Sequence, residues 1–171
     1  MNPFAFWPTC TVVTVAAVID VRHRRIPNWL VVPFLAFGIL SGGVADGSQG
    51  VIRSLSGIAL AGGIAGPFCY LRGMGMGDLK LLAGIGAWLG PRQLASALVA
   101  TALAGGILAL AVALWKRSLL RCLDGLQELL AGFWERGFRP HGALALDNAG
   151  VVKIPYAVAI ATGTIFSFYV Q

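Results

Sequence analysis

The chain has few charged residues and few of the side chains that bind metals or form disulfides. Only 12% of its 171 residues are Asp, Glu, Lys or Arg, and it contains three cysteines and two histidines. No two cysteines form a CxxC pair, which argues against a zinc ribbon and against a disulfide framework. His23 and His141 are isolated and lack the HExxH spacing that brings two imidazoles to one helix face. We therefore expect no metal and no cofactor.

Other signals of common functions are missing as well. The chain lacks the GxSxG elbow of many serine hydrolases. It has no base-stacking aromatic platform, so its net charge of +6 does not indicate nucleic-acid binding. No Lys or Arg precedes the first apolar run, and no small-residue cleavage site precedes Asp20. We therefore expect the N-terminal run to be a membrane helix and not a signal peptide.

Apolar side chains are what the chain has in excess. Hydrophobic residues make up 57% of it, and the mean hydropathy is +0.79, as expected for an integral membrane protein. Uncharged runs cover residues 1–19, 26–45, 54–71, 93–115 and 154–171. Each is about the length that crosses a hydrocarbon core of roughly 30 Å. A sixth run, 81–91, is too short alone, but a helix that begins with Asp78 and Lys80 and covers 77–91 crosses most of the membrane. The sequence predicts an all-α polytopic membrane protein, with about six transmembrane helices in one domain spanning residues 1–171.

The basic residues predict how this domain is oriented. Of the thirteen Lys and Arg residues, all but Arg53 and Arg92 fall in the connections after the first, third and fifth predicted helices. Because cytoplasmic loops carry the excess of Lys and Arg, these connections are predicted to be cytoplasmic and both termini to lie outside. Contact with anionic membrane lipids explains the positive charge.

Two aspartates fall on the predicted cytoplasmic side. Asp20 lies where the first apolar run meets DVRHRRIPN, and Asp78 lies in GMGMGDLKLLAGIGAWLG. An ionised Asp at the centre of a membrane helix costs roughly 2.5–3.5 kcal/mol on insertion scales, so each is a candidate functional residue. Asp46 falls on the opposite side and is not a candidate. Structural alternatives are that Asp20 pairs with Arg24 and that Asp78 caps a helix N-terminus.

The residues around Asp78 allow two interpretations. Gly73, Gly75 and Gly77 precede it without the strand and βαβ unit that a dinucleotide site requires. These glycines either leave the backbone open for an extended polypeptide to approach the carboxylate or form a flexible turn between membrane helices. Lys80 either biases the charge on Asp78 or extends to lipid headgroups, and we favour the headgroups.

The segments DVRHRRIPN, GMGMGDLKLLAGIGAWLG and KIPYAVAIATG occur in this order and resemble those of type IV prepilin peptidases. More narrowly, the chain is similar to the small, stand-alone prepilin peptidases of tight-adherence (Flp-type) pilus systems, in the GxGD class of membrane aspartyl proteases. The resemblance implies that Asp20 and Asp78 are the catalytic pair. It also implies that the substrate is a prepilin, cut after its short basic leader at the cytoplasmic face of the bacterial inner membrane. Gly75, Gly77 and Lys80 are candidate substrate-binding or site-shaping residues.

The resemblance also bears on a second activity. Larger bifunctional relatives methylate the new pilin N-terminus and carry paired CxxC motifs in a cytoplasmic domain between their first helices. Here that connection is only residues 20–25. We therefore expect a peptidase without a methyltransferase or zinc domain.

A reaction mechanism follows from the pair of carboxylates. Two carboxylates brought close in a low-dielectric site share a proton over part of the working pH range. The ionised partner then deprotonates a water that attacks the scissile carbonyl, and the protonated partner stabilises the oxyanion and protonates the leaving amine. Which aspartate holds the proton is left open. The alternative is a non-catalytic membrane scaffold or small transporter in which both aspartates line a polar pathway.

Two further patterns concern packing. Small residues at helical spacing predict close helix contacts. They are Ala61, Gly62, Ala65 and Gly66 in one predicted helix and Gly86 and Gly90 in the next. Between residues 116 and 136, apolar side chains at helical spacing lie opposite charged ones, which predicts one cytoplasmic amphipathic helix. An irregular loop is predicted over 137–150.

Overall fold

The computed structural model describes residues 3–71, 73–115 and 156–170. Four helices contain most of them: α1 (Pro3–His23), α2 (Asn28–Tyr70), α3 (Met76–Trp115) and α5 (Tyr156–Ser167). Within these ranges there is no strand, so the all-α prediction is confirmed for the described part of the chain. The predicted amphipathic helix and the predicted irregular loop lie outside the described residues.

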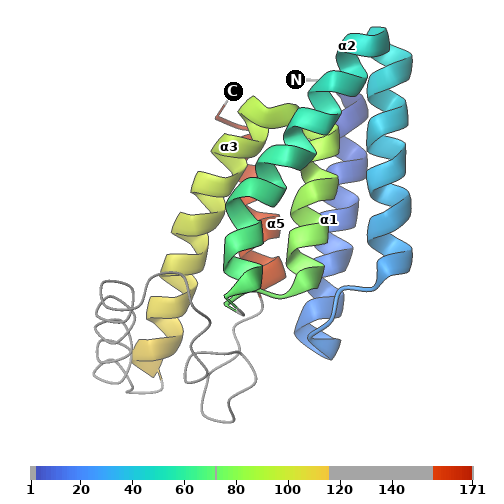
Figure 1. Cartoon of the computed structure of the whole chain (residues 1–171). Helices are drawn as coiled ribbons and strands as arrows, with labels where there is room; N and C mark the ends of the chain where they lie inside the picture. Colours follow the sequence, from blue (N-terminus) through green and yellow to red (C-terminus); the bar gives the residue numbers. More distant parts are fainter. Residues whose placement is uncertain (1–2, 72, 116–155, 171) are drawn as a thin grey trace.

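Two of the helices are bent at a single glycine. Gly47 inside α2 has φ 59° and ψ −138°, and Gly90 inside α3 has φ 74° and ψ 176°. A positive φ is unfavourable for residues with a Cβ atom, so glycine allows each bend. In Figure 1, the two arms of each bent helix run in opposite directions from the bend, and both bends lie at the same end of the molecule. Gly90 therefore reverses the chain direction, a role that its predicted helix-contact spacing did not indicate.

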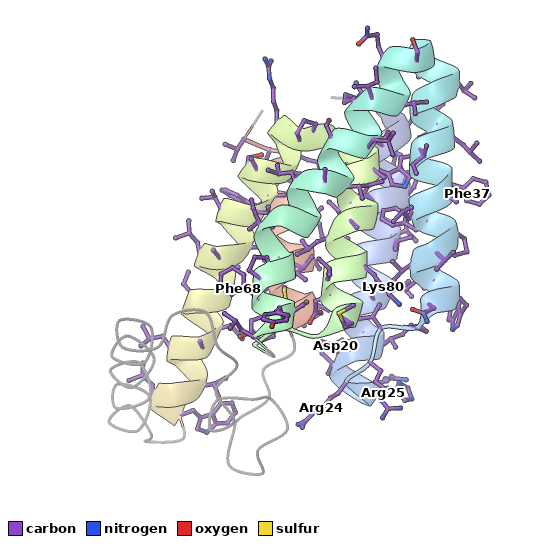
Figure 2. All side chains as sticks on the ribbon, in the orientation of Figure 1. Asp20, Arg24, Arg25, Phe37, Phe68 and Lys80 are labelled. Carbon is purple, nitrogen blue, oxygen red and sulfur yellow. The ribbon has the colours of Figure 1, made fainter. Side chains whose placement is uncertain are left out.

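The apolar runs of the sequence coincide with α1, the arms of α2 and α3, and α5. Three helices, α1, α2 and α3, are long and apolar enough to cross a membrane, and α5 is a shorter apolar helix. Large apolar side chains are exposed along them; Phe37, for example, is 62% exposed and points away from the helices in Figure 2. Exposed apolar faces of this extent indicate contact with lipid. The chain is therefore a membrane protein, and the count of six crossings stays a prediction.

A close glycine contact and a buried hydrogen bond join the second arm of α2 to the first arm of α3. Gly57 lies directly against the backbone of Gly86, and a Cβ atom on either glycine would collide with the carbonyl of the other. Next to this contact, the buried Ser54 hydroxyl donates to the carbonyl oxygen of Ala87 at 2.7 Å. The absence of side chains at Gly57 and Gly86 thus lets the two backbones approach closely.

The prediction of close contacts at small residues is confirmed in part. Gly86 makes such a contact, and Ala61 and Ala65 are buried in the core. Gly62 and Gly66 have open space where a Cβ atom would be, so the prediction is wrong for these two. Both follow a buried alanine in the sequence, and helical geometry turns them to a different side.

The end of the molecule opposite the two bends holds the short connections. α1 ends where Arg24 takes a left-handed conformation, with φ 52°, and donates its backbone N–H to the carbonyl of Asp20 at 2.7 Å. Pro27 has an extended conformation, and α2 begins at the next residue, Asn28. Figure 1 shows this connection, the loop between α2 and α3, and the start of α5 at this same end.

Asp46, by contrast, lies beside the bend of α2. Its carboxylate forms an ion pair with Arg53 across the bend, at 3.2 Å. No other ion pair occurs within the described ranges. Asp46 therefore has a structural partner, in agreement with its exclusion as a candidate functional residue.

The glycine contact leads to a prediction about stability. We expect Gly57→Ala to lower the free energy of unfolding by about 1–3 kcal/mol, because its Cβ atom overpacks the contact with Gly86. Gly62→Ala is the matched control, since its Cβ atom meets open space and alanine has the higher helix propensity, worth up to about 1 kcal/mol. Unfolding of the purified protein in detergent would measure both. Equal effects of the two substitutions would contradict the packing described.

Candidate functional site

Asp78 lies in the first turn of α3, two residues after the helix begins at Met76. The backbone N–H groups of Asp78 and Leu79 donate to the carbonyl oxygen of Gly75 at 3.1 and 3.3 Å. The Asp78 carboxylate in turn accepts a hydrogen bond from the backbone of Gly75. This is the capping arrangement in which an acidic side chain satisfies a free N–H group at the positive end of a helix. Capping does not require burial, yet Asp78 is only 9% exposed.

Asp20 lies in the last turn of α1 and is half-buried. Its Oδ2 atom accepts a hydrogen bond from the backbone N–H of Ala157, the second residue of α5, at 3.4 Å. The first turn of any helix has free N–H groups, and here a carboxylate from another helix binds one of them. Within the described residues, Asp20 forms no ion pair with Arg24, so the alternative pairing is not observed. In Figure 2, Arg24 and Arg25 project away from the helices.

The structure brings the two predicted aspartates together at one end of the helix bundle. Asp20 and Asp78 are close enough for their carboxylates to interact electrostatically. The first comes from the end of α1 and the second from the start of α3, so the pair forms only when these helices pack. Two carboxylates in one partly buried site are the arrangement in which a proton is readily shared.

Two contacts connect the segment after Asp20 to the segment around Asp78. A Cβ atom on Gly77 would lie 3.1 Å from the Cβ atom of Ile26, so the connection between α1 and α2 passes directly over the start of α3. The Lys80 ammonium donates a hydrogen bond to Oδ1 of Asn28 at 3.0 Å. Lys80 thus has a protein partner, and its contact with lipid headgroups stays a prediction.

The sequence included Ile26 and Asn28 in the segment DVRHRRIPN but assigned neither of them a contact with the residues around Asp78. Two features of the sequence could have pointed to Asn28. It is a polar residue directly after a proline that starts a helix, and Lys80 was a lysine near a helix start that needed a partner.

The three glycines before Asp78 differ in what they contribute. A Cβ atom on Gly75 would lie 3.1 Å from Oδ2 of Asp78, and one on Gly77 would meet Ile26, whereas one on Gly73 would only reach ordinary contact at 3.6 Å from Phe68. Glycine at positions 75 and 77 therefore lets the Asp78 carboxylate and Ile26 lie closer to the backbone than a Cβ atom ordinarily allows. The approach of a substrate backbone to these glycines stays a prediction.

The last turn of α2 supports the glycine loop from its other side. The half-buried Cys69 thiol donates to the carbonyl oxygen of Gly75 at 3.5 Å. That carbonyl is the same one that accepts from the Asp78 and Leu79 amides, so three donors fix its position. Within the described ranges, no group of three His, Cys, Asp or Glu residues is placed to hold a metal ion.

Comparisons with known proteins show which family the chain resembles. The model of the type IV leader peptidase family matches residues 7–110, which contain both aspartates and the glycine loop. The chain is 35% identical over 113 residues to a prepilin leader peptidase/N-methyltransferase of Burkholderia pseudomallei, covering 63% of this chain and 36% of the relative. It is 32% identical over 126 residues to the protein of that name from Pectobacterium carotovorum, covering 70% of this chain and 43% of the relative.

The similarity covers only part of these relatives. In the Aeromonas salmonicida protein of the same name, 95 residues are 36% identical, which is 52% of this chain and 33% of the relative. The chain thus spans less than half of the length of the curated relatives it matches. No solved structure shows a significant match.

The hydrogen bond between Asp20 and α5 leads to a prediction about amide exchange. In Asp20→Ala, we expect the Ala157 amide to exchange with solvent about tenfold faster, because it loses a bond to a charged acceptor worth about 1.4 kcal/mol at a half-exposed site. In Asp20→Asn, the amide oxygen can still accept, so the increase should be smaller. The Ala161 amide in the next turn is the control. Unchanged exchange at Ala157 in Asp20→Ala would show that the bond does not form.

Proposed function

We propose a function on the premise that this chain belongs to the type IV leader peptidase family, whose model matches more than half of it. The proposed function is that of a membrane aspartyl endopeptidase, which removes the leader peptide of type IV prepilins. The relatives described above carry the name prepilin leader peptidase. The observation that carries the proposal for this chain is the convergence of Asp20 and Asp78 at one end of an apolar helix bundle.

The proposed catalysis uses the two carboxylates as base and acid. Each has a backbone hydrogen-bond partner, Ala157 for Asp20 and Gly75 for Asp78, which restrains its orientation. The ionised carboxylate removes a proton from a water molecule, which attacks the scissile carbonyl carbon. The other carboxylate, protonated, donates to the developing oxyanion and then supplies the proton that the leaving amine needs. After both transfers the pair again holds one proton, the one taken from the water.

The proposed substrate matches the place of the pair in the molecule. A prepilin has a short basic leader followed by an apolar helix, so its scissile bond lies at the membrane surface. Asp20 and Asp78 lie at the end of the bundle where Arg24 and Arg25 project, and a high content of Lys and Arg is typical of cytoplasmic loops. We therefore propose cleavage at the cytoplasmic face of the bacterial inner membrane.

The proposed substrate class within the family is the Flp-type prepilin. It is supported by the resemblance of the three sequence segments to stand-alone peptidases of tight-adherence systems. Residues 24–27 alone separate α1 from α2. That leaves no room between them for the zinc-binding domain of bifunctional relatives, and we propose peptidase activity without methyltransferase activity for this chain. Membrane lipids and the prepilin are the proposed partners.

The orientation is tested by the accessibility of single cysteines. In a chain whose native cysteines are replaced, we introduce Ser48→Cys beside the bend of α2 or Arg25→Cys in the connection after α1. Both positions are exposed. With both termini outside, a membrane-impermeant maleimide added to intact spheroplasts should label position 48 and not position 25, and permeabilisation should expose both. The reverse labelling pattern would contradict the proposed orientation.

The reaction is tested with purified enzyme in lipid and a prepilin precursor. We expect Asp20→Asn and Asp78→Asn each to reduce the cleavage rate at least about 100-fold, because each removes one partner of the acid–base pair. Asp46→Asn, at the other end of the molecule, should cleave at the wild-type rate. Mass spectrometry should locate a single cut at the end of the basic leader.

Two outcomes of this experiment would contradict the proposal. Undiminished cleavage by either Asn variant, with folding retained, would remove the catalytic pair. Proton-coupled transport that is lost in Asp78→Asn, without any cleavage by the wild type, would favour the transporter alternative.

A further inference from the structure

The hydrogen bond between Lys80 and Asn28 joins two helix starts and has no part in the chemistry proposed above. Lys80 lies two residues after Asp78 on α3, and Asn28 is the first residue of α2. Their side chains meet at 3.0 Å. Figure 2 shows Lys80 at the same end of the molecule as Asp20.

A direct role for the Lys80 charge is not supported by the geometry. Residues two apart on a helix do not face each other, so Lys80 and Asp78 point to different sides of α3. Among the residues that the structure describes, Lys80 forms no ion pair with a carboxylate. Lys80 instead binds a neutral amide oxygen. Lys80 can therefore act on Asp78 through the position of the helix.

The second contact at this junction limits movement in the opposite direction. Gly77 packs closely against Ile26, and a Cβ atom on Gly77 would lie in tight contact with the Ile26 Cβ atom, at 3.1 Å. This close packing opposes movement of the start of α3 toward the connection, and the Lys80 hydrogen bond opposes movement away from it. The connection itself is short and begins with the hydrogen bond from Arg24 to the carbonyl of Asp20. The path from Asp20 to Asp78 thus runs through a few restrained residues.

We propose that Lys80 and Asn28 are positioning residues, whose hydrogen bond holds the first turn of α3 so that Asp78 faces Asp20 at the working separation. This inference rests on the proposed function. Displacing a catalytic group by about 1 Å can cost about 100-fold in rate, so even a small shift of α3 is sufficient. Both side chains are exposed, so their removal should change global stability little.

The test compares turnover, substrate affinity and local opening in four variants. We expect Asn28→Ala and Lys80→Ala each to lower kcat about ten- to 100-fold with little change in KM or unfolding temperature. The double variant should be no worse than either single one, because both remove the same bond. Lys80→Gln supplies an N–H donor without the charge and should recover most of the lost turnover. Arg53→Met, which breaks the ion pair at the other end, is the control and should cleave like the wild type.

A second readout does not depend on activity. In Asn28→Ala and Lys80→Ala, we expect the Asp78 and Leu79 amides, which bond to Gly75, to exchange several-fold faster than in the wild type. Unchanged exchange at these amides would overturn the positioning role. So would additive losses of turnover in the double variant, or a loss in Lys80→Gln as large as in Lys80→Ala.

The two proposals fail differently in this experiment. If Asp78→Asn cleaves the prepilin as fast as the wild type, the proposed function is wrong. If Asp78→Asn is inactive while Asn28→Ala and Lys80→Ala cleave like the wild type, the proposed function stands and the positioning role alone is overturned.

Discussion

Holding two carboxylates close together in a helix bundle is unfavourable, because like charges repel and burial removes water from each group. The protein offsets this cost with backbone donors at two helix starts. Asp78 lies in the first turn of α3 and bonds to Gly75, and Asp20 bonds to Ala157 in the first turn of α5. The N-terminus of a helix favours a negative charge by about 0.3–1 kcal/mol at exposed sites, so each carboxylate has a compensating dipole beside it. The rest of the fold places these two helix starts next to the end of α1.

The bends in α2 and α3 are what allow this placement. Gly47 returns α2 to the end where the carboxylates lie, so that Cys69 and the start of α3 are placed there, and Gly90 returns α3 to the same end. The contact between Gly57 and Gly86 fixes the first arm of α3 against α2. At the start of that arm, Gly77 contacts the connection that follows Asp20, and Lys80 bonds to the first residue of α2. A continuous set of contacts therefore runs from the membrane-embedded core to the Asp78 carboxylate.

Much of this could be predicted from the sequence because it depends on composition and local spacing. The apolar runs predicted the helices, and the distribution of Lys and Arg predicted that Asp20 and Asp78 lie on the same side of the membrane. The sequence predicted that the chain reverses between residues 45 and 54 and near residue 91, but not that a single glycine makes each bend, because the predicted boundaries were set at charged residues such as Arg53. Gly47 ends the first arm through its backbone conformation alone.

Long-range partners were the other features that the sequence did not reveal. The bond from Ala157 to Asp20 and the bond from Lys80 to Asn28 both depend on how distant helices pack. Similarly, the sequence does not distinguish Gly57 from Gly62. Only the packing of α2 against α3 shows that a Cβ atom is excluded at Gly57 and tolerated at Gly62.

The most direct test of the central claim, that Asp20 and Asp78 act together on a scissile peptide bond, is a binding measurement. A prepilin peptide whose scissile amide is replaced by a hydroxyl-bearing isostere imitates the tetrahedral intermediate, and such analogues bind at least about 100-fold more tightly than substrates. We predict this tighter binding for the wild type in lipid, and its loss in both Asp20→Asn and Asp78→Asn. Equal affinity of wild type and both variants for the isostere would contradict a joint catalytic role of the two carboxylates.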